Sequence, residues 1–296
     1  MNVEKILKSR DGLSRHQVFE MSTGSNDILL QRYSKTFLLL LSGINLVLGL
    51  IFYLDPVFVA PSWPWPVKEL AVRFLGAIFL AIAFGCWSAV RAEKWQRAKI
   101  LVLVGGTFFG ITGIVSLVGG VTVSSDVSTW AWTTYFLAAA VGCFVLLQYH
   151  GWHRTHPEVL TGSPMSKGAR AFFGIQTSIV GIFGIMMLLL PSIAQQEFWP
   201  WKVYVSTLQT FASLFLATCL ATGWATMQKD PERIKVLLPL DAIFPSLALL
   251  AVGISWSVIV TESPTWLVTG VWVGLYSFVA AGSTILYFTL RRQSSP

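Results

Sequence analysis

Residues 36–54, Thr-Phe-Leu-Leu-Leu-Leu-Ser-Gly-Ile-Asn-Leu-Val-Leu-Gly-Leu-Ile-Phe-Tyr-Leu, form an uncharged and almost wholly apolar segment. About 20 apolar residues in a helix span the hydrocarbon core of a bilayer, so this segment predicts a transmembrane helix. Further segments of similar length and character lie at 69–90, 99–121, 129–149, 172–193, 202–226, 235–259 and 266–290. The sequence therefore predicts an all-α integral membrane protein with eight transmembrane helices.

The composition of the whole chain agrees with this fold class. The 296 residues are 54% hydrophobic and only 12% charged, whereas soluble domains carry roughly 25% charged residues. These values exclude a disordered chain, a coiled coil and a disulfide scaffold. In a soluble domain the net charge of +7 would suggest nucleic acid. In a membrane protein it first reports loop topology, so we expect no nucleic-acid partner.

The distribution of basic residues predicts the orientation. Eighteen of the 21 Lys and Arg residues lie in the N-terminal tail, in alternate loops and at the C-terminus, while the opposite loops carry only Lys68 and Lys202. Because cytoplasmic loops are enriched in Lys and Arg, both termini are predicted to be cytoplasmic. The even number of spans agrees, and we expect a bacterial-type plasma membrane. No signal peptide is visible in the first 35 residues.

An internal duplication organises the chain. Matching residues recur in the same order at an offset of 135 to 137: Gly49 and Gly184, Pro56 and Pro191, Trp63-Pro64-Trp65 and Trp199-Pro200-Trp201, Phe79-Leu80-Ala81 and Phe215-Leu216-Ala217, Trp87 and Trp224, and Thr129-Trp130 and Thr265-Trp266. Each half holds four spans, so the halves are predicted to be parallel repeats related by an axis along the membrane normal.

The repeats divide the chain into five parts. We expect a cytoplasmic tail at 1–35, the first four-helix repeat at 36–150, and a cytoplasmic linker at 151–171. The second four-helix repeat is expected at 172–290, followed by a cytoplasmic C-terminus at 291–296.

Tryptophan is concentrated on the predicted outer side, where Trp63, Trp65, Trp199, Trp201, Trp130 and Trp266 flank the spans. Trp favours the headgroup level of a membrane because its ring is apolar and its N–H is polar. Two interpretations remain open. The residues anchor the helices at the interface, or they form an aromatic lid over a ligand cleft near the outer leaflet.

Ionisable residues inside spans are costly and are therefore functional candidates. Arg73 lies in the second span, where Glu69, one helical turn earlier, is its nearest predicted partner. The duplication aligns Arg73 with Gln209, so chemistry at this position differs between the halves.

The second ionisable candidate, Asp241, lies between two prolines in Pro239-Leu-Asp-Ala-Ile-Phe-Pro245. Prolines free backbone carbonyls and bend helices. Asp241 is predicted either to cap a restarted helix or to form a cation or proton site of the kind found in broken transporter helices.

Histidine is concentrated between the halves, at His150, His153 and His156. This spacing permits a surface metal site or one haem ligand, but Gly151 and Pro157 indicate a solvated loop. No other cofactor or metal is indicated.

Each half resembles the small four-helix membrane proteins of the DoxX-like type. The resemblance rests on Gly49 and Pro56 in the first span, on Arg73-Phe-Leu-Gly76-Ala77 at the start of the second, and on Arg91 and Arg97 in the short basic loop. In the second half Gln209 replaces the arginine and Ala212 the glycine. Some members of that family are associated with membrane redox or detoxification systems, which the resemblance loosely implies here.

Three functions remain open from the sequence. The favoured one is a non-enzymatic accessory or scaffold component that contacts a partner complex, a second copy of the chain, lipid or a small apolar ligand through its Trp-rich rim. The second is a transporter with a site at the repeat interface that includes Asp241 and Arg73. The third is a subunit of a membrane redox system that uses the histidine cluster.

Overall fold

A computed structural model describes residues 30–122, 126–151, 165–262 and 266–293. Within these ranges the chain is helical and contains no strand. Within the described residues, eight helical segments are long and apolar enough to cross a membrane, the seventh being Pro231–Ile254; this confirms the predicted number and is consistent with a multi-pass membrane protein. They are α3 (Arg32–Leu54), α5 (Glu69–Arg91), α6 (Trp95–Thr122), α7 (Val127–His150), α8 (Lys167–Leu189), α10 (Val205–Met227), α12 (Leu238–Ile254), which follows the short α11 (Pro231–Lys235), and α14 (Trp266–Gln293).

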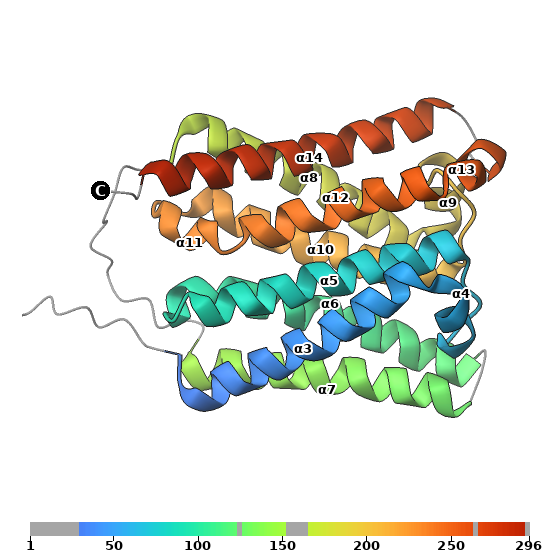
Figure 1. The fold of residues 1–296 in the computed structure, drawn as a ribbon, viewed down its shortest axis with the longest axis horizontal. Coiled ribbons are helices and arrows are strands. Elements are labelled where there is room, and N and C mark those ends of the chain that lie inside the picture. The colour runs from blue at the N-terminus through green and yellow to red at the C-terminus, as the bar shows by residue number, and fades with distance from the viewer. Residues whose placement is uncertain (1–29, 123–125, 152–164, 263–265, 294–296) are drawn as a thin grey trace, which may run out of the picture.

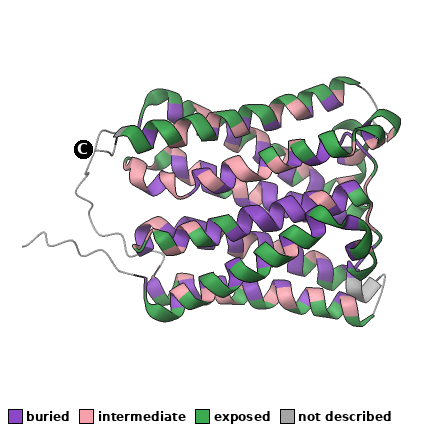
Figure 2. Cartoon of the chain, in the orientation of Figure 1, coloured by how far each residue is buried: buried purple, intermediate pink, exposed green. Residues whose placement is uncertain are grey.

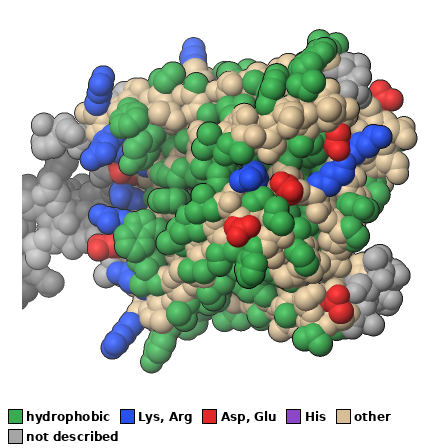
Figure 3. Space-filling view, turned by 45° about the vertical axis from the view of Figure 1, so that its right-hand side comes forward, with side chains coloured by type: hydrophobic (Ala, Val, Ile, Leu, Met, Phe, Trp, Pro, Cys, Tyr) green, Lys and Arg blue, Asp and Glu red, His purple; other side chains and the backbone are tan. Residues whose placement is uncertain are grey.

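The long helices lie side by side, and α3 and α14 bring the two described chain ends to the same end of the bundle (Figure 1). We call this the terminal end. Short helices lie at the opposite end: α4 (Pro56–Val59), the 3-10 helix η1 (Ala60–Ser62), α9 (Pro191–Glu197) and α13 (Trp256–Glu262). Basic side chains gather at the terminal end, and hydrophobic side chains cover much of the surface between the ends (Figure 3).

Helix packing divides the bundle into a centre and two flanks. In the first half α3 packs against α5 and α6 against α7; in the second, α8 packs against α10 and α12 against α14. The halves meet where α5 contacts α12 and α6 contacts α10. The central helix α5 is therefore almost wholly buried, whereas the flanking helices leave much of their apolar surface exposed (Figure 2). Such a surface suits contact with lipid.

The backbones of α3 and α5 approach closely at two glycines. A Cβ added at Gly76 would lie 2.6 Å from the backbone nitrogen of Tyr53, and one at Gly49 would lie 2.8 Å from that of Leu80. Small residues allow this approach because apolar helices in a membrane associate mainly through close packing. In the second half Gly184 packs likewise against Leu216 of α10.

Two predicted spans end too late. The fifth was expected to reach residue 193, but α8 ends at Leu189, because Pro191 cannot continue the helix and instead starts α9. The seventh was expected over 235–259. There α12 ends at Ile254, and Ser255 leaves the helical conformation before α13 starts. The other long helices lie within about five residues of their predicted bounds, as is usual for helix ends.

Gly76→Ala should destabilise the bundle because the new methyl group would press on the backbone of α3, which cannot move as a side chain can. We expect a loss of about 1–3 kcal/mol, measured as a lower midpoint of thermal unfolding in detergent. Gly43→Ala on α3 is the matched control, since a Cβ there meets nothing within 4 Å. Equal midpoints for the two variants would contradict the close packing of α3 and α5.

Candidate functional site

Asp241 lies in the first turn of α12 and is 3% exposed. Its Oδ1 atom accepts a hydrogen bond of 2.5 Å from Nε2 of Gln176 on α8, and its Oδ2 atom accepts one of 2.6 Å from Oγ of Ser283 on α14. Among the residues that the structure describes, no Lys or Arg forms an ion pair with this carboxylate. Three helices of the second half thus converge on one buried acidic group.

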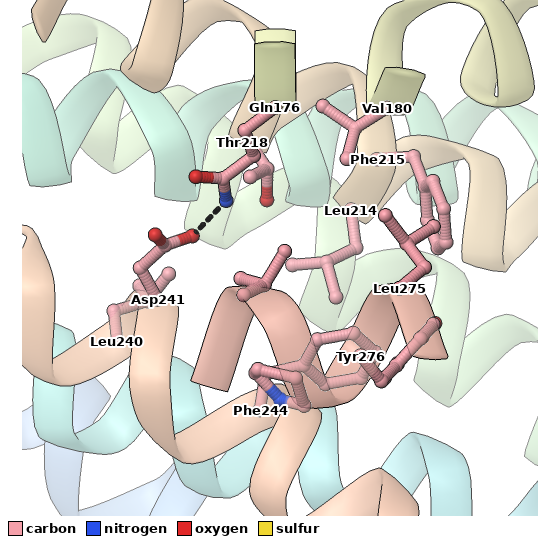
Figure 4. A pocket seen from close by; sticks show the side chains of 12 residues that line it. Gln176, Val180, Leu214, Phe215, Thr218, Leu240, Asp241, Phe244, Leu275 and Tyr276 are labelled. Carbon is pink, nitrogen blue, oxygen red and sulfur yellow. Dashed lines mark hydrogen bonds between the residues drawn. The ribbon is translucent and has the colours of Figure 1, made fainter. Parts of the chain in front are cut away.

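The carboxyl group borders a pocket between α8, α10, α12 and α14 (Figure 4). Apart from Asp241, Gln176, Thr218 and the hydroxyl of Tyr276, its lining is apolar. The remaining residues are Val180, Leu214, Phe215, Leu240, Phe244, Pro245, Leu275 and Val279. Burial of a charged group in such surroundings costs several kcal/mol unless hydrogen bonds or a counter-charge compensate it. The hydrogen bonds from Gln176 and Ser283 supply part of that compensation.

The capping role considered for Asp241 is wrong. The N-cap of α12 is Leu237, Pro239 occupies the first turn, and the carboxylate bonds to the neighbouring helices instead. Pro245 lies inside α12. Since proline has no N–H, it also removes the helical donor for the backbone carbonyl of Asp241, four residues earlier.

Arg73 has a structural partner. Its Nη1 atom donates to the backbone oxygen of Tyr53 at 2.7 Å, and no Arg73–Glu69 ion pair is present in the described part of the chain. Glu69 is therefore not its partner, contrary to expectation. Gln209 makes the corresponding bond in the second half, from Nε2 to the oxygen of Leu188 at 3.2 Å. Both acceptors lie in the last turn of a helix that ends before a proline, where carbonyls lack helical donors.

The tryptophan residues separate into two groups. Trp63, Trp65, Trp199 and Trp201 are at most 4% exposed, so they are not part of an exposed outer rim. The segments around α4 and α9 fold inward and place these rings in aromatic clusters. Trp63 packs against Phe52, Phe79, Trp132 and Phe136, and Trp199 against Phe74, Phe211 and Trp272.

Several of these rings join the two halves. Trp65 Nε1 donates to Thr207 on α10 at 2.9 Å, and Trp199 and Trp201 pack on Phe74 of α5. In contrast, Trp130 and Trp266 are 41% and 60% exposed. Of the six candidate tryptophans, only these two are exposed enough to contact lipid or a partner.

His150 is not a loop residue. It ends α7, is buried, and stacks on Trp95 with ring centroids 4.5 Å apart. Its Nε2 atom lies 2.8 Å from the hydroxyl of Ser34. His153 and His156 lie outside the described residues, so the cluster itself stays a prediction. The described residues contain no group of three His, Cys, Asp or Glu side chains placed to hold a metal ion.

The sequence reasoning missed Gln176, Ser283 and Tyr276. A polar side chain within an apolar span was the available signal, and Gln176 is such a residue in the predicted fifth span. Nothing local connects it to Asp241, 65 residues later.

Comparison of the chain with family models, curated proteins and solved structures finds no match. The resemblance to DoxX-like proteins therefore stays a prediction.

The bond between Arg73 and Tyr53 predicts which substitutions the position accepts. Arg73→Gln should retain nearly full stability, because Gln209 shows that an amide can make the corresponding bond. Arg73→Leu should lose about 1–3 kcal/mol, since it leaves a buried carbonyl without this donor. Thermal unfolding of the two variants in detergent distinguishes them. Equal losses would mean that the positive charge matters and the hydrogen bond does not.

Proposed function

We propose that this chain is a non-enzymatic membrane protein whose second half binds a small, mostly apolar molecule. The observation that carries the proposal is the carboxylate of Asp241, held by Gln176 and Ser283 on the wall of an apolar pocket. Pockets for small molecules combine an apolar lining with a few placed polar groups that fix orientation. This pocket has that composition.

The proposed ligand contacts lie in the interior of the bundle and not at a tryptophan-rich outer rim. Four of the six candidate tryptophans are buried and support the fold at the end opposite to the termini. Two of them, Trp199 and Trp201, pack near the pocket, since both contact Trp272, which stacks on Tyr276 of the pocket lining. An accessory role toward a partner complex is compatible with ligand binding. In that role the exposed Trp130 and Trp266 would make the contact.

A transporter that uses Asp241 is the second candidate. It is favoured by the buried carboxylate without a basic partner among the described residues and by Pro245, which interrupts hydrogen bonding of α12. Arg73 does not belong to the same site. It borders a separate cavity of about 480 Å³, together with Lys68 and Glu262. The transporter hypothesis is therefore carried by Asp241 alone.

We also propose the duplication and the cytoplasmic location of both termini. The duplication is supported by corresponding contacts in the two halves. Arg73 and Gln209 bond to the ends of α3 and α8, and Gly49 and Gly184 pack against the next helix. A further pair supports a longer offset in the last helix, because Phe37 packs on Gly142 and Phe172 on Gly282.

Ligand binding predicts that a small molecule is retained through purification in mild detergent. Mass spectrometry of extracts from the wild type should detect it, and Val180→Trp should lose it because the larger side chain fills the pocket. Val141→Trp, at an exposed site on α7, is the matched control and should retain it. Identical extracts from all three proteins would contradict the pocket as the binding site.

The orientation predicts opposite results for two C-terminal fusions. Green fluorescent protein folds in the cytoplasm and should fluoresce, whereas alkaline phosphatase needs disulfides that form outside it and should be inactive. Fusions after residue 262, before the last helix, should give the reverse pattern. An active phosphatase at the C-terminus would exclude cytoplasmic termini.

A further inference from the structure

We infer that the ligand of this pocket is an amphipathic amine, with its ammonium group at Asp241 and its apolar part between α8 and α14. This inference rests on the proposed function and adds the chemical class of the ligand and its position.

The pocket contains buried polar atoms that no group in the described residues satisfies. Both oxygens of Asp241 accept hydrogen bonds, and Oε1 of Gln176 and the hydroxyl of Tyr276, both buried, have no partner among the described residues. A buried polar atom without a partner costs about 1–3 kcal/mol. An ammonium group carries only donors and a positive charge. It therefore supplies the positive charge that the carboxylate lacks and a donor for Oε1 of Gln176, whose amide already contacts Asp241.

Aromatic rings also border the pocket that Asp241 borders. Phe215, Phe244 and Tyr276 all line the pocket, and the ring centroid of Tyr276 lies 5.6 Å from that of Phe244 and 6.5 Å from that of Phe215. The faces of aromatic rings attract cations, and the effect strengthens when the cation is removed from water. Figure 4 shows the rings of Phe244 and Tyr276 close together beside the pocket.

The shape of the space indicates an amphipathic molecule. The cavity beside Asp241 has a volume of only about 40 Å³, which suits a small head group. It shares Phe215, Leu275 and Tyr276 with a second, wider cavity of about 290 Å³. The lining of the wider cavity is mainly apolar and comes mostly from α14, with Phe183 of α8, Phe215 of α10, and Phe198 and Trp199; Glu197 is the one charged residue in it. Since a bare metal ion would leave this apolar space unused, an amine with a hydrocarbon part fits better.

The wider cavity lies between α14 and Phe183 of α8, on two helices that pack mainly on other partners. α8 packs on α10, and α14 packs on α12. Val271 on α14 lines the wider cavity and is also exposed on the flank of the bundle. Entry of the amine from the side, through the hydrocarbon region, follows from this position.

The test compares two probes of equal length, decylamine and decan-1-ol, one charged at pH 7 and one neutral. Equilibrium dialysis of radiolabelled probe against phosphatidylcholine nanodiscs, with and without the full chain, measures binding in excess of lipid partition. We expect saturable decylamine binding near one per chain and an affinity for the amine at least tenfold above that for the alcohol. In Asp241→Asn, which retains the shape of the side chain, this ratio should fall at least tenfold.

Two further variants keep the test decisive if Asp241→Asn does not fold. Phe244→Leu should lower the amine-to-alcohol ratio severalfold because it removes one aromatic face, and Val271→Trp should weaken both probes because it narrows the opening. Saturable binding of both probes with a ratio unchanged by Asp241→Asn and Phe244→Leu would overturn the amine inference and leave the proposed pocket intact. Absence of saturable binding for both probes would overturn both.

Discussion

A backbone carbonyl inside an apolar medium needs a hydrogen-bond donor, and the ends of α3 and α8 have to meet this requirement within the bundle. Both helices stop before a proline, and the next long helix supplies a donor through Arg73 or Gln209. Because these carbonyls have donors, both helices can end there, and the chain turns inward through α4 and α9. The buried tryptophans, the contact between the halves through Trp65, and the aromatic wall beside Tyr276 all depend on that turn.

The sequence was sufficient to predict the eight apolar helices but not which of them lie at the centre. The segments that form α3 and α5 are almost equally apolar. Yet 39% of the residues in the apolar stretch of α3 are buried inside the protein, against 83% in that of α5. Lipid and protein interior are similarly apolar, so hydropathy cannot distinguish the two environments. The same ambiguity explains the tryptophans. An amphipathic ring suits a membrane interface and equally a buried position, where Trp65 finds a hydroxyl partner.

Asp241 was recognisable as a candidate because an acidic residue inside a span is rare. That Gln176 and Ser283 are its partners could not be predicted. Gln176 and Ser283 lie on helices whose proximity to α12 is set by packing across the whole second half, which no local pattern reports. His150 was misplaced for a related reason. Gly151 correctly marks the end of α7, but the burial of the preceding imidazole depends on Ser34 and Trp95 from distant parts of the chain.

If the halves are repeats, as we propose, Asp241 aligns with Gly105 at an offset of 136, and a Cβ at Gly105 would lie 3.5 Å from Sγ of Cys143. A homodimer of single four-helix units would carry any buried acid twice and incur the desolvation cost of several kcal/mol twice. A single polypeptide with two unlike halves incurs it once. Substitutions tolerated near Gly105 need therefore not be tolerated near Asp241.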